Sequence, residues 1–213
     1  SQLTGQLTVA SDSKITLDRD NAGGSVTGSR VYNGPVVFSS PSTVLEVKSL
    51  HSGVQMNLGA NFTASQGVLR VGDVPGVQQV LRLDTANTQG AGLVLDFGSG
   101  ADTVIRTNVG VAVVATATTI PAPRAYAIGD IIATDPSHKL EGSTSNNSSV
   151  EYQIGGLGND RVLAAAIVDG TGFTSGLNPR VARTYLNKVG SGTLSLTNNN
   201  TVYTGTTTVT AGR

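Results

Sequence analysis

The sequence predicts an all-β protein built from many short strands. Apolar and polar side chains alternate from the first residues, with Leu3, Leu7 and Val9 on one side and Thr4 and Thr8 on the other. Similar runs begin again about every 8 to 14 residues, which is the spacing of strands joined by turns in all-β proteins. The composition agrees, because the 213 residues include 27 glycines and 26 threonines but only three glutamates and four lysines.

The expected strands follow one another through the first half of the chain. A polar turn at residues 11–13 separates the first run from Ile15 and Leu17, and residues 18–24 form a glycine-containing loop. The later strand-like runs are residues 36–40, 44–50, 54–58, 67–72, 80–84, 92–97 and 103–107.

Two segments also admit a helix, although no long window carries an apolar stripe with the helical period. They are residues 77–83 and residues 161–168, the second of which contains three consecutive alanines. We favour strands, because glycine-rich segments closely flank residues 161–168.

The segment 121–159 differs in composition from the rest. Three prolines lie in it, and a loop rich in serine and asparagine separates two expected strands, 126–134 and 150–154. We interpret this segment as a hairpin or small subdomain inserted into the β scaffold. The predicted division is a scaffold at 1–120, the inserted region at 121–159 and a further strand region at 160–213.

The composition excludes several classes of function. Fourteen basic and fourteen acidic residues give a net charge of zero, and only 13% of residues are charged. We therefore expect no electrostatic binding to nucleic acid. The chain has no cysteine, which excludes disulfides and thiolate chemistry. No run approaches 18 apolar residues, so we expect no membrane span, and the first residues do not resemble a signal peptide.

Two groups of acidic residues are candidates for catalysis. Asp18 and Asp20 lie two residues apart, but the loop that follows them favours a solvated turn. Asp96, Asp102 and Arg106 would converge if the intervening bend brought them together, yet turn capping explains the two aspartates equally well. We therefore expect no catalytic residues and classify the protein as a non-enzyme.

No pattern of metal or cofactor ligands stands out. Residues 18–21 offer oxygens for calcium but lack the spacing of a calcium-binding loop. Gly155, Gly156 and Gly158 have the wrong spacing for a nucleotide-binding loop and are better interpreted as a turn. His138 follows a proline turn and is expected to be exposed. The expectation is no metal and no cofactor.

The most specific feature is the C-terminal segment KVGSGTLSLTNNNTVYTGTTTVTAGR. Gly190 and Gly192 permit a corner, Leu194 and Leu196 supply a short apolar strand, and three asparagines at 198–200 form a polar bend. These asparagines form either an amide ladder between stacked units or a solvated turn. One such unit cannot bury its own apolar face, so it requires a similar unit stacked on it.

This segment resembles the autotransporter-associated β-strand repeat, also called the passenger-associated transport repeat, over residues 188–212. One departure is Val202, which lies between Thr201 and Tyr203 where the family places threonine and tyrosine together. The positions that match the family pattern are Lys188, Gly190, Gly192, Thr193, Leu194, Leu196, Asn199, Asn200, Tyr203, Gly205, Thr207, Val209, Ala211 and Gly212.

The resemblance implies a bacterial surface or secreted protein whose repeats stack as a parallel β-helix, and it implies that the repeat has no catalytic residue. The predicted fold is therefore a parallel β-helix or a related architecture of stacked strands. We expect Leu194, Leu196, Tyr203 and Val209 to be buried and the threonines to lie outside.

The expected function is structural, as a subunit of an extracellular fibre or as an adhesive stalk. Both ends of the sequence resemble strand-forming units of the stack whose outer β edge has no partner. This predicts end-to-end self-association through open β edges. One alternative is a carbohydrate-binding or carbohydrate-cleaving β-helix of the tailspike type, with a surface polysaccharide as partner. The other is a jelly roll of the shell or capsid type.

Overall fold

The computed structural model describes residues 5–10, 14–19, 30–51, 55–59, 61–84, 91–108, 122–144, 148–170 and 182–213, with the backbone alone at 14–19, 30 and 31. These residues form nineteen strands, and every pairing between them is parallel. Within these ranges no helix is long and apolar enough to cross a membrane.

The strands form three long faces, which we name sheets I, II and III. Sheet I contains β2 (Lys14–Arg19), β5 (Val44–Ser49), β7 (Gln66–Val71), β9 (Gly92–Asp96) and β12 (Asp130–Ile132). Sheet II contains β3 (Arg30–Tyr32), β6 (Gln55–Leu58), β8 (Val80–Leu83), β10 (Val104–Thr107), β13 (Lys139–Ser143) and β16 (Ala166–Val168). Sheet III contains β11 (Arg124–Ile128), β14 (Val150–Ile154), β17 (Thr184–Lys188) and β19 (Thr207–Val209).

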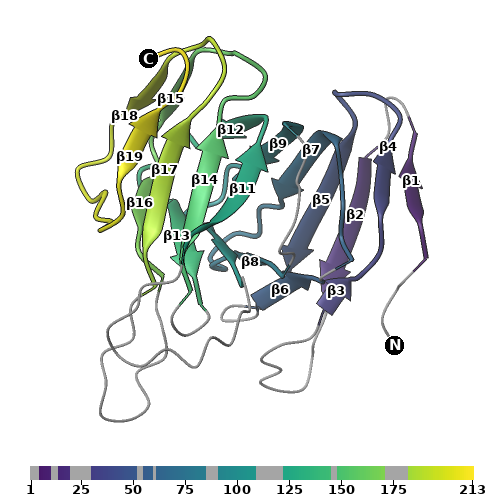
Figure 1. The fold of residues 1–213 in the computed structure, drawn as a ribbon. Helices are drawn as coiled ribbons and strands as arrows, with labels where there is room; N and C mark the ends of the chain where they lie inside the picture. The colour runs from purple at the N-terminus through teal and green to yellow at the C-terminus, as the bar shows by residue number, and fades with distance from the viewer. Residues whose placement is uncertain are drawn as a thin grey trace.

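Two further strand pairs complete the stack. The pair β15 (Arg161–Leu163) and β18 (Leu194–Leu196) continues sheet I, because the Ala164 N–H donates to the Ala133 carbonyl at 2.9 Å. The other pair, β1 (Leu7–Val9) and β4 (Val36–Phe38), lies at the N-terminal end of the molecule (Figure 1).

From β11 onward the chain visits the three faces in turn, and each circuit forms one rung of the stack, whereas from β5 to β10 its strands alternate between sheets I and II. For example, β11, β12 and β13 belong to sheets III, I and II, and β14, β15 and β16 repeat the same path one rung further on. The rungs progress from β1 at one end of the molecule to β19 at the other (Figure 1). The prediction of an all-β, parallel β-helix-like stack is confirmed.

The core consists of columns of apolar side chains in register from rung to rung. In sheet I, Leu45, Leu69, Leu95 and Ile131 occupy successive strands at one register position, and none of them is exposed. Burial of such a side chain contributes about 1.5–3 kcal/mol. Sheet II supplies the facing column, namely Met56, Leu81, Ile105, Leu140 and Ile167. Alternation along each strand therefore places one apolar column inside each face.

Two expectations about local structure are now decided. The helical alternatives at 77–83 and 161–168 are wrong where the chain is described, because β8, β15 and β16 form there. The segment 121–159 was interpreted as a hairpin or a small subdomain. The hairpin is wrong, because β11 and β14 pair in parallel and the described strands of the segment belong to the same sheets as the strands before and after them.

Candidate functional site

The edge at which sheet III turns into sheet I concentrates the polar contacts between rungs. We name it the corner edge and define it by four loops: 128–130, 154–161, 188–194 and 209–213. Gly155, Gly190 and Gly212 stand in successive corners and have φ angles of +106°, +69° and +74°. A Cβ on Gly190 would overlap the Gly155 carbonyl oxygen, and a Cβ on Gly212 would lie 2.6 Å from the Gly190 oxygen. Only glycine therefore allows these corners to stack so closely.

Lys188 turns inward at the end of β17 and is only 3% exposed. It occupies the register position of Ile154 in the preceding rung and of Val209 in the following one. Its Nζ donates to the carbonyl oxygens of Val189, of Gly190 at 2.8 Å and of Ala211 at 3.4 Å. The lysine therefore satisfies carbonyls from two successive corners, which an aliphatic residue cannot do.

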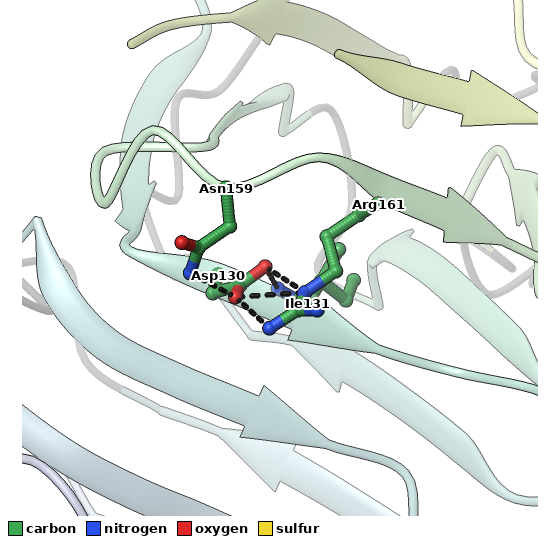
Figure 2. Close-up of polar contacts among 4 residues, drawn as sticks. All are labelled: Asp130, Ile131, Asn159 and Arg161. Carbon is green, nitrogen blue, oxygen red and sulfur yellow. Dashed lines mark hydrogen bonds and ion pairs between the residues drawn. The ribbon is translucent and has the colours of Figure 1, made fainter. Parts of the chain in front are cut away.

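Asp130 connects two adjacent rungs at the same edge (Figure 2). Its carboxylate is almost fully buried and accepts hydrogen bonds from the Ile131 N–H and from Asn159 Nδ2, both at 2.8 Å. Arg161 reaches the same carboxylate through Nη2 at 2.6 Å and through Nε at 2.8 and 2.9 Å. The hydrogen bond to Asp130 raises the pKa of Arg161 above its ordinary value. This pairing holds the loop after β14 against β12.

The Asp130 contacts predict a measurable loss of stability. Asp130→Ala removes the carboxylate that accepts these hydrogen bonds and leaves the half-buried Arg161 without its partner. The free energy of unfolding should fall by roughly 2–3 kcal/mol. This is less than for a fully buried ion pair, because Arg161 is partly exposed. Urea unfolding followed by circular dichroism measures the change. Asp73→Asn is the control, because Asp73 is exposed and holds only Ser99 Oγ at 3.3 Å. Equal stability of the two variants would contradict a bracing role for Asp130.

Asp160 forms the corresponding contact one rung further on. Its Oδ1 accepts the Thr193 N–H at 2.6 Å, and this backbone hydrogen bond lowers the pKa of Asp160 below its ordinary value. Arg213 and Lys188 lower this pKa further through their charges. The repeat is thus tied to the preceding corner by a carboxylate that is ionised in the folded state.

The lowered pKa of Asp160 predicts a loss of stability in acid. A carboxyl group with a depressed folded-state pKa contributes stability above its unfolded value, which is about 4, and loses it as the pH falls through the folded value. Asp160→Asn should therefore flatten the dependence of the unfolding midpoint on pH below about pH 5 and leave the slope near neutrality unchanged. Thermal unfolding of both proteins across pH 2–7 checks this, and superimposable profiles would refute it.

The asparagine bend and the end of the repeat also bind to earlier rungs. Asn198 Nδ2 donates to the carbonyl oxygens of Ala164 at 2.6 Å and of Pro136 at 2.7 Å. The bend is therefore tied to backbone carbonyls, whereas Asn200 is exposed. Asp169 accepts the Thr204 N–H at 3.0 Å, which fixes the second half of the repeat.

The apolar side chains of the repeat are less buried than the sequence predicted. Leu194 and Tyr203 pack partly against the core. Leu196 and Val209, however, are 39% and 57% exposed, so the expectation that they are buried is wrong. Each lies on the outermost described strand of its face, β18 or β19, and no other described strand pairs with the outer side of that strand. Thr207, one of the threonines expected outside, is exposed.

The remaining repeat glycines have steric roles. Gly192 is buried, and a Cβ there would lie 2.5 Å from the Gly158 carbonyl oxygen. Gly205 donates its N–H to the Thr184 carbonyl at 3.1 Å, and a Cβ on it would lie 2.7 Å from Tyr185 Cγ. These positions permit close approach between rungs.

The catalytic candidates from the sequence are not brought together. Asp96 pairs with Arg70 at 2.7 Å, whereas Arg106 pairs with Glu141 at 3.0 Å. Asp102 has a φ of 58° in a turn, where its N–H donates to Ser137 Oγ. The side chain of Asp18 and all of residues 20–24 lie outside the described residues, so the structure does not test the expected solvated turn there.

A groove on the outer face of sheet I gathers charged side chains that the sequence analysis did not connect. Glu46, Arg70 and Asp96 occupy adjacent strands in register. Together with Asp73 and Ser99 they line a cavity of about 340 Å³. Glu46, Arg70 and Asp96 stand at equivalent positions of their strands, and this spacing is the sequence signal for the groove. The signal can be recognised only when the strand register is known.

His138 was expected to be exposed, and this expectation is wrong. It is fully buried, its ring stacks on Phe97 with centroids 5.3 Å apart, and its Nε2 lies 2.6 Å from the Gly100 carbonyl oxygen. The proline turn at 135–137 is a corner between β12 and β13, and His138, which follows this corner directly, points into the core. Composition alone could not distinguish such a corner from a surface turn.

The fold and the corner edge define a class of protein: a stack of parallel β rungs, held in register by glycine corners and by polar contacts between rungs. Comparison with known families adds a more specific result. The model of the passenger-associated-transport-repeat family matches residues 186–213, which confirms the resemblance seen in the sequence. No curated protein and no solved structure gives a significant match. The chain therefore combines a β-stacked fold with a repeat of the autotransporter passenger type.

Proposed function

We propose that this protein is a non-catalytic structural component of a bacterial surface or of a secreted assembly, in which stacked β rungs form a fibre or an adhesive stalk. The family match supports the surface or secreted location, because the repeat is of the passenger type. The composition supports the structural role, since charged residues are few.

The observation that carries the proposal is the parallel stack itself, whose apolar columns continue in register from rung to rung. Val202, which bridges Val168, and Val209 on β19 are the outermost described positions of their faces and are 68% and 57% exposed, and we name these two positions the exposed rung. Their apolar side chains would pack on a further parallel rung, whether of the same chain or of a second copy. Association through different surfaces on the two partners does not close and builds filaments.

Electron microscopy and light scattering across a concentration series test this function. The wild-type chain should form filaments or ladders of oligomers as its concentration rises, and Val209→Lys should suppress them. Val162→Lys is the matched control, because Val162 is 61% exposed on β15, away from the last rung. Monomers at every concentration would overturn self-association through the exposed rung.

Polysaccharide binding is a second candidate, which the sheet I groove favours. The groove is lined by the carboxylates of Glu46, Asp73 and Asp96 and by the guanidinium of Arg70, and this set of donors and acceptors suits the hydroxyl groups of a neutral saccharide. No aromatic side chain lines the groove, however, so stacking on sugar rings would not contribute.

Affinity electrophoresis tests the groove. The wild type should be retarded in gels that contain neutral polysaccharide, and the double variant Glu46→Gln/Asp73→Asn should migrate faster. Glu151→Gln on sheet III is the control, because it changes the charge outside the groove. The absence of retardation by any neutral or acidic polysaccharide would remove this candidate.

A further inference from the structure

The buried ammonium of Lys188 lies where the corners of three successive rungs meet. It donates to Val189 and Gly190 of its own corner and to Ala211 of the following corner. A Cβ on Gly155, in the preceding corner, would lie 3.1 Å from Nζ, and a Cβ on Gly212 would lie 2.9 Å from it. Glycine at both positions therefore leaves the space that the ammonium occupies.

The ligands of this ammonium are carbonyl oxygens. Among the described residues, no carboxylate lies within ion-pair distance of Nζ. Asp160 is the acidic group whose pKa responds to the charge of Lys188, and its carboxylate binds Thr193. A site lined by neutral carbonyl oxygens suits a weakly hydrated monovalent cation, whereas divalent cations prefer carboxylates.

We propose that the corner is a carbonyl-lined site for a monovalent cation, which Lys188 fills from within the chain. The third oxygen comes from the next rung, so the site is complete only when that rung is stacked in the correct register. A free ammonium or potassium ion should occupy the same site when the lysine side chain is removed. This inference depends on the stacked fold and not on filament formation.

Rescue of Lys188→Ala by free cations tests the proposal. Ammonium chloride should raise the thermal unfolding midpoint of this variant by about 3 °C at ten times the dissociation constant, and further with the logarithm of its concentration. Potassium chloride should act in the same direction. Tetramethylammonium chloride at equal ionic strength should not raise the unfolding midpoint, because this ion has no N–H donor and is too large for the site. Hydrogen exchange of the β19 amides should slow in parallel.

Two control variants separate site binding from general salt effects. Lys188→Met fills the site with an uncharged side chain and should not respond to ammonium. Lys139→Ala removes an exposed lysine from β13 and should respond to all three salts alike. If Lys188→Ala does not fold, its refolding yield with and without ammonium replaces the midpoint as the measurement. Equal effects of ammonium and tetramethylammonium, or equal responses of Lys188→Ala and Lys188→Met, would overturn the proposal.

Discussion

Gly190→Ala should destabilise the last rungs more than any other single substitution at the corner edge. The φ of +69° disfavours any side chain, and the new Cβ would overlap the Gly155 carbonyl oxygen. Backbone oxygen cannot move aside as a flexible side chain can, so two rungs must separate. We expect a loss of about 4 kcal/mol or separate unfolding of β17–β19, which is the range of the most severe single substitutions.

Gly76→Ala is the matched control for this experiment. Gly76 has a φ of +72°, close to that of Gly190, but among the described residues other than its two chain neighbours no atom lies within 4 Å of the position of its Cβ. The control therefore measures the conformational cost alone, which we expect to be about 1 kcal/mol. Thermal unfolding and hydrogen exchange of the sheet III strands compare the two variants. Similar losses of stability in both variants would show that close stacking at the corner edge contributes nothing to the stability of the fold.

Tyr152→Ala should produce the largest loss in the core. Tyr152 is fully buried, and its ring meets that of Tyr126 edge to face with centroids 6.2 Å apart. Its hydroxyl donates to the Glu141 carbonyl at 2.5 Å. Removal of the ring leaves a cavity between sheets III and II, for which we expect about 3–5 kcal/mol. Tyr152→Phe keeps the ring and loses one hydrogen bond, so it should cost only about 1–2 kcal/mol.

The same residue predicts alkaline behaviour. Burial raises the pKa of Tyr152 far above its ordinary value. A raised folded-state pKa contributes stability that is present below the unfolded value, about pH 10, and is lost as the pH rises above it. Chemical unfolding at a series of alkaline pH values should show a steeper loss for the wild type than for Tyr152→Phe. Identical slopes would mean that another group controls alkaline unfolding.

Much of the fold could be predicted because each strand carries its own signal. Alternation at 44–50 and 67–72 specified β5 and β7 almost residue by residue. The path of the chain between strands could not be predicted in this way, since a glycine corner and a hairpin turn use the same residues. The expected strand at 126–134 is therefore two strands on different faces, separated by a corner at Gly129.

The candidate site was predictable only where the repeat pattern extends. The pattern singled out Lys188 and Gly190, but their roles depend on carbonyls of neighbouring rungs, which no local pattern encodes. Asp130 and Arg161 were missed altogether, because they are 31 residues apart and become neighbours only through the stack. Exposure of Val209 was also unpredictable, since its pattern is that of an inward residue and its burial depends on what lies above it.

The register of the stack has a mechanical consequence. Paired positions on neighbouring rungs are between 21 residues apart, from Leu186 to Thr207, and 36 residues apart, from Val94 to Asp130. Tension along the axis acts on all the interfaces between rungs in series, so a rung that is paired on one side alone should separate before rungs that are paired on both sides. Each step releases a contour length of roughly 70–130 Å. A stack of this kind should therefore lengthen under force in separate steps of one rung each, and should not unfold in a single event.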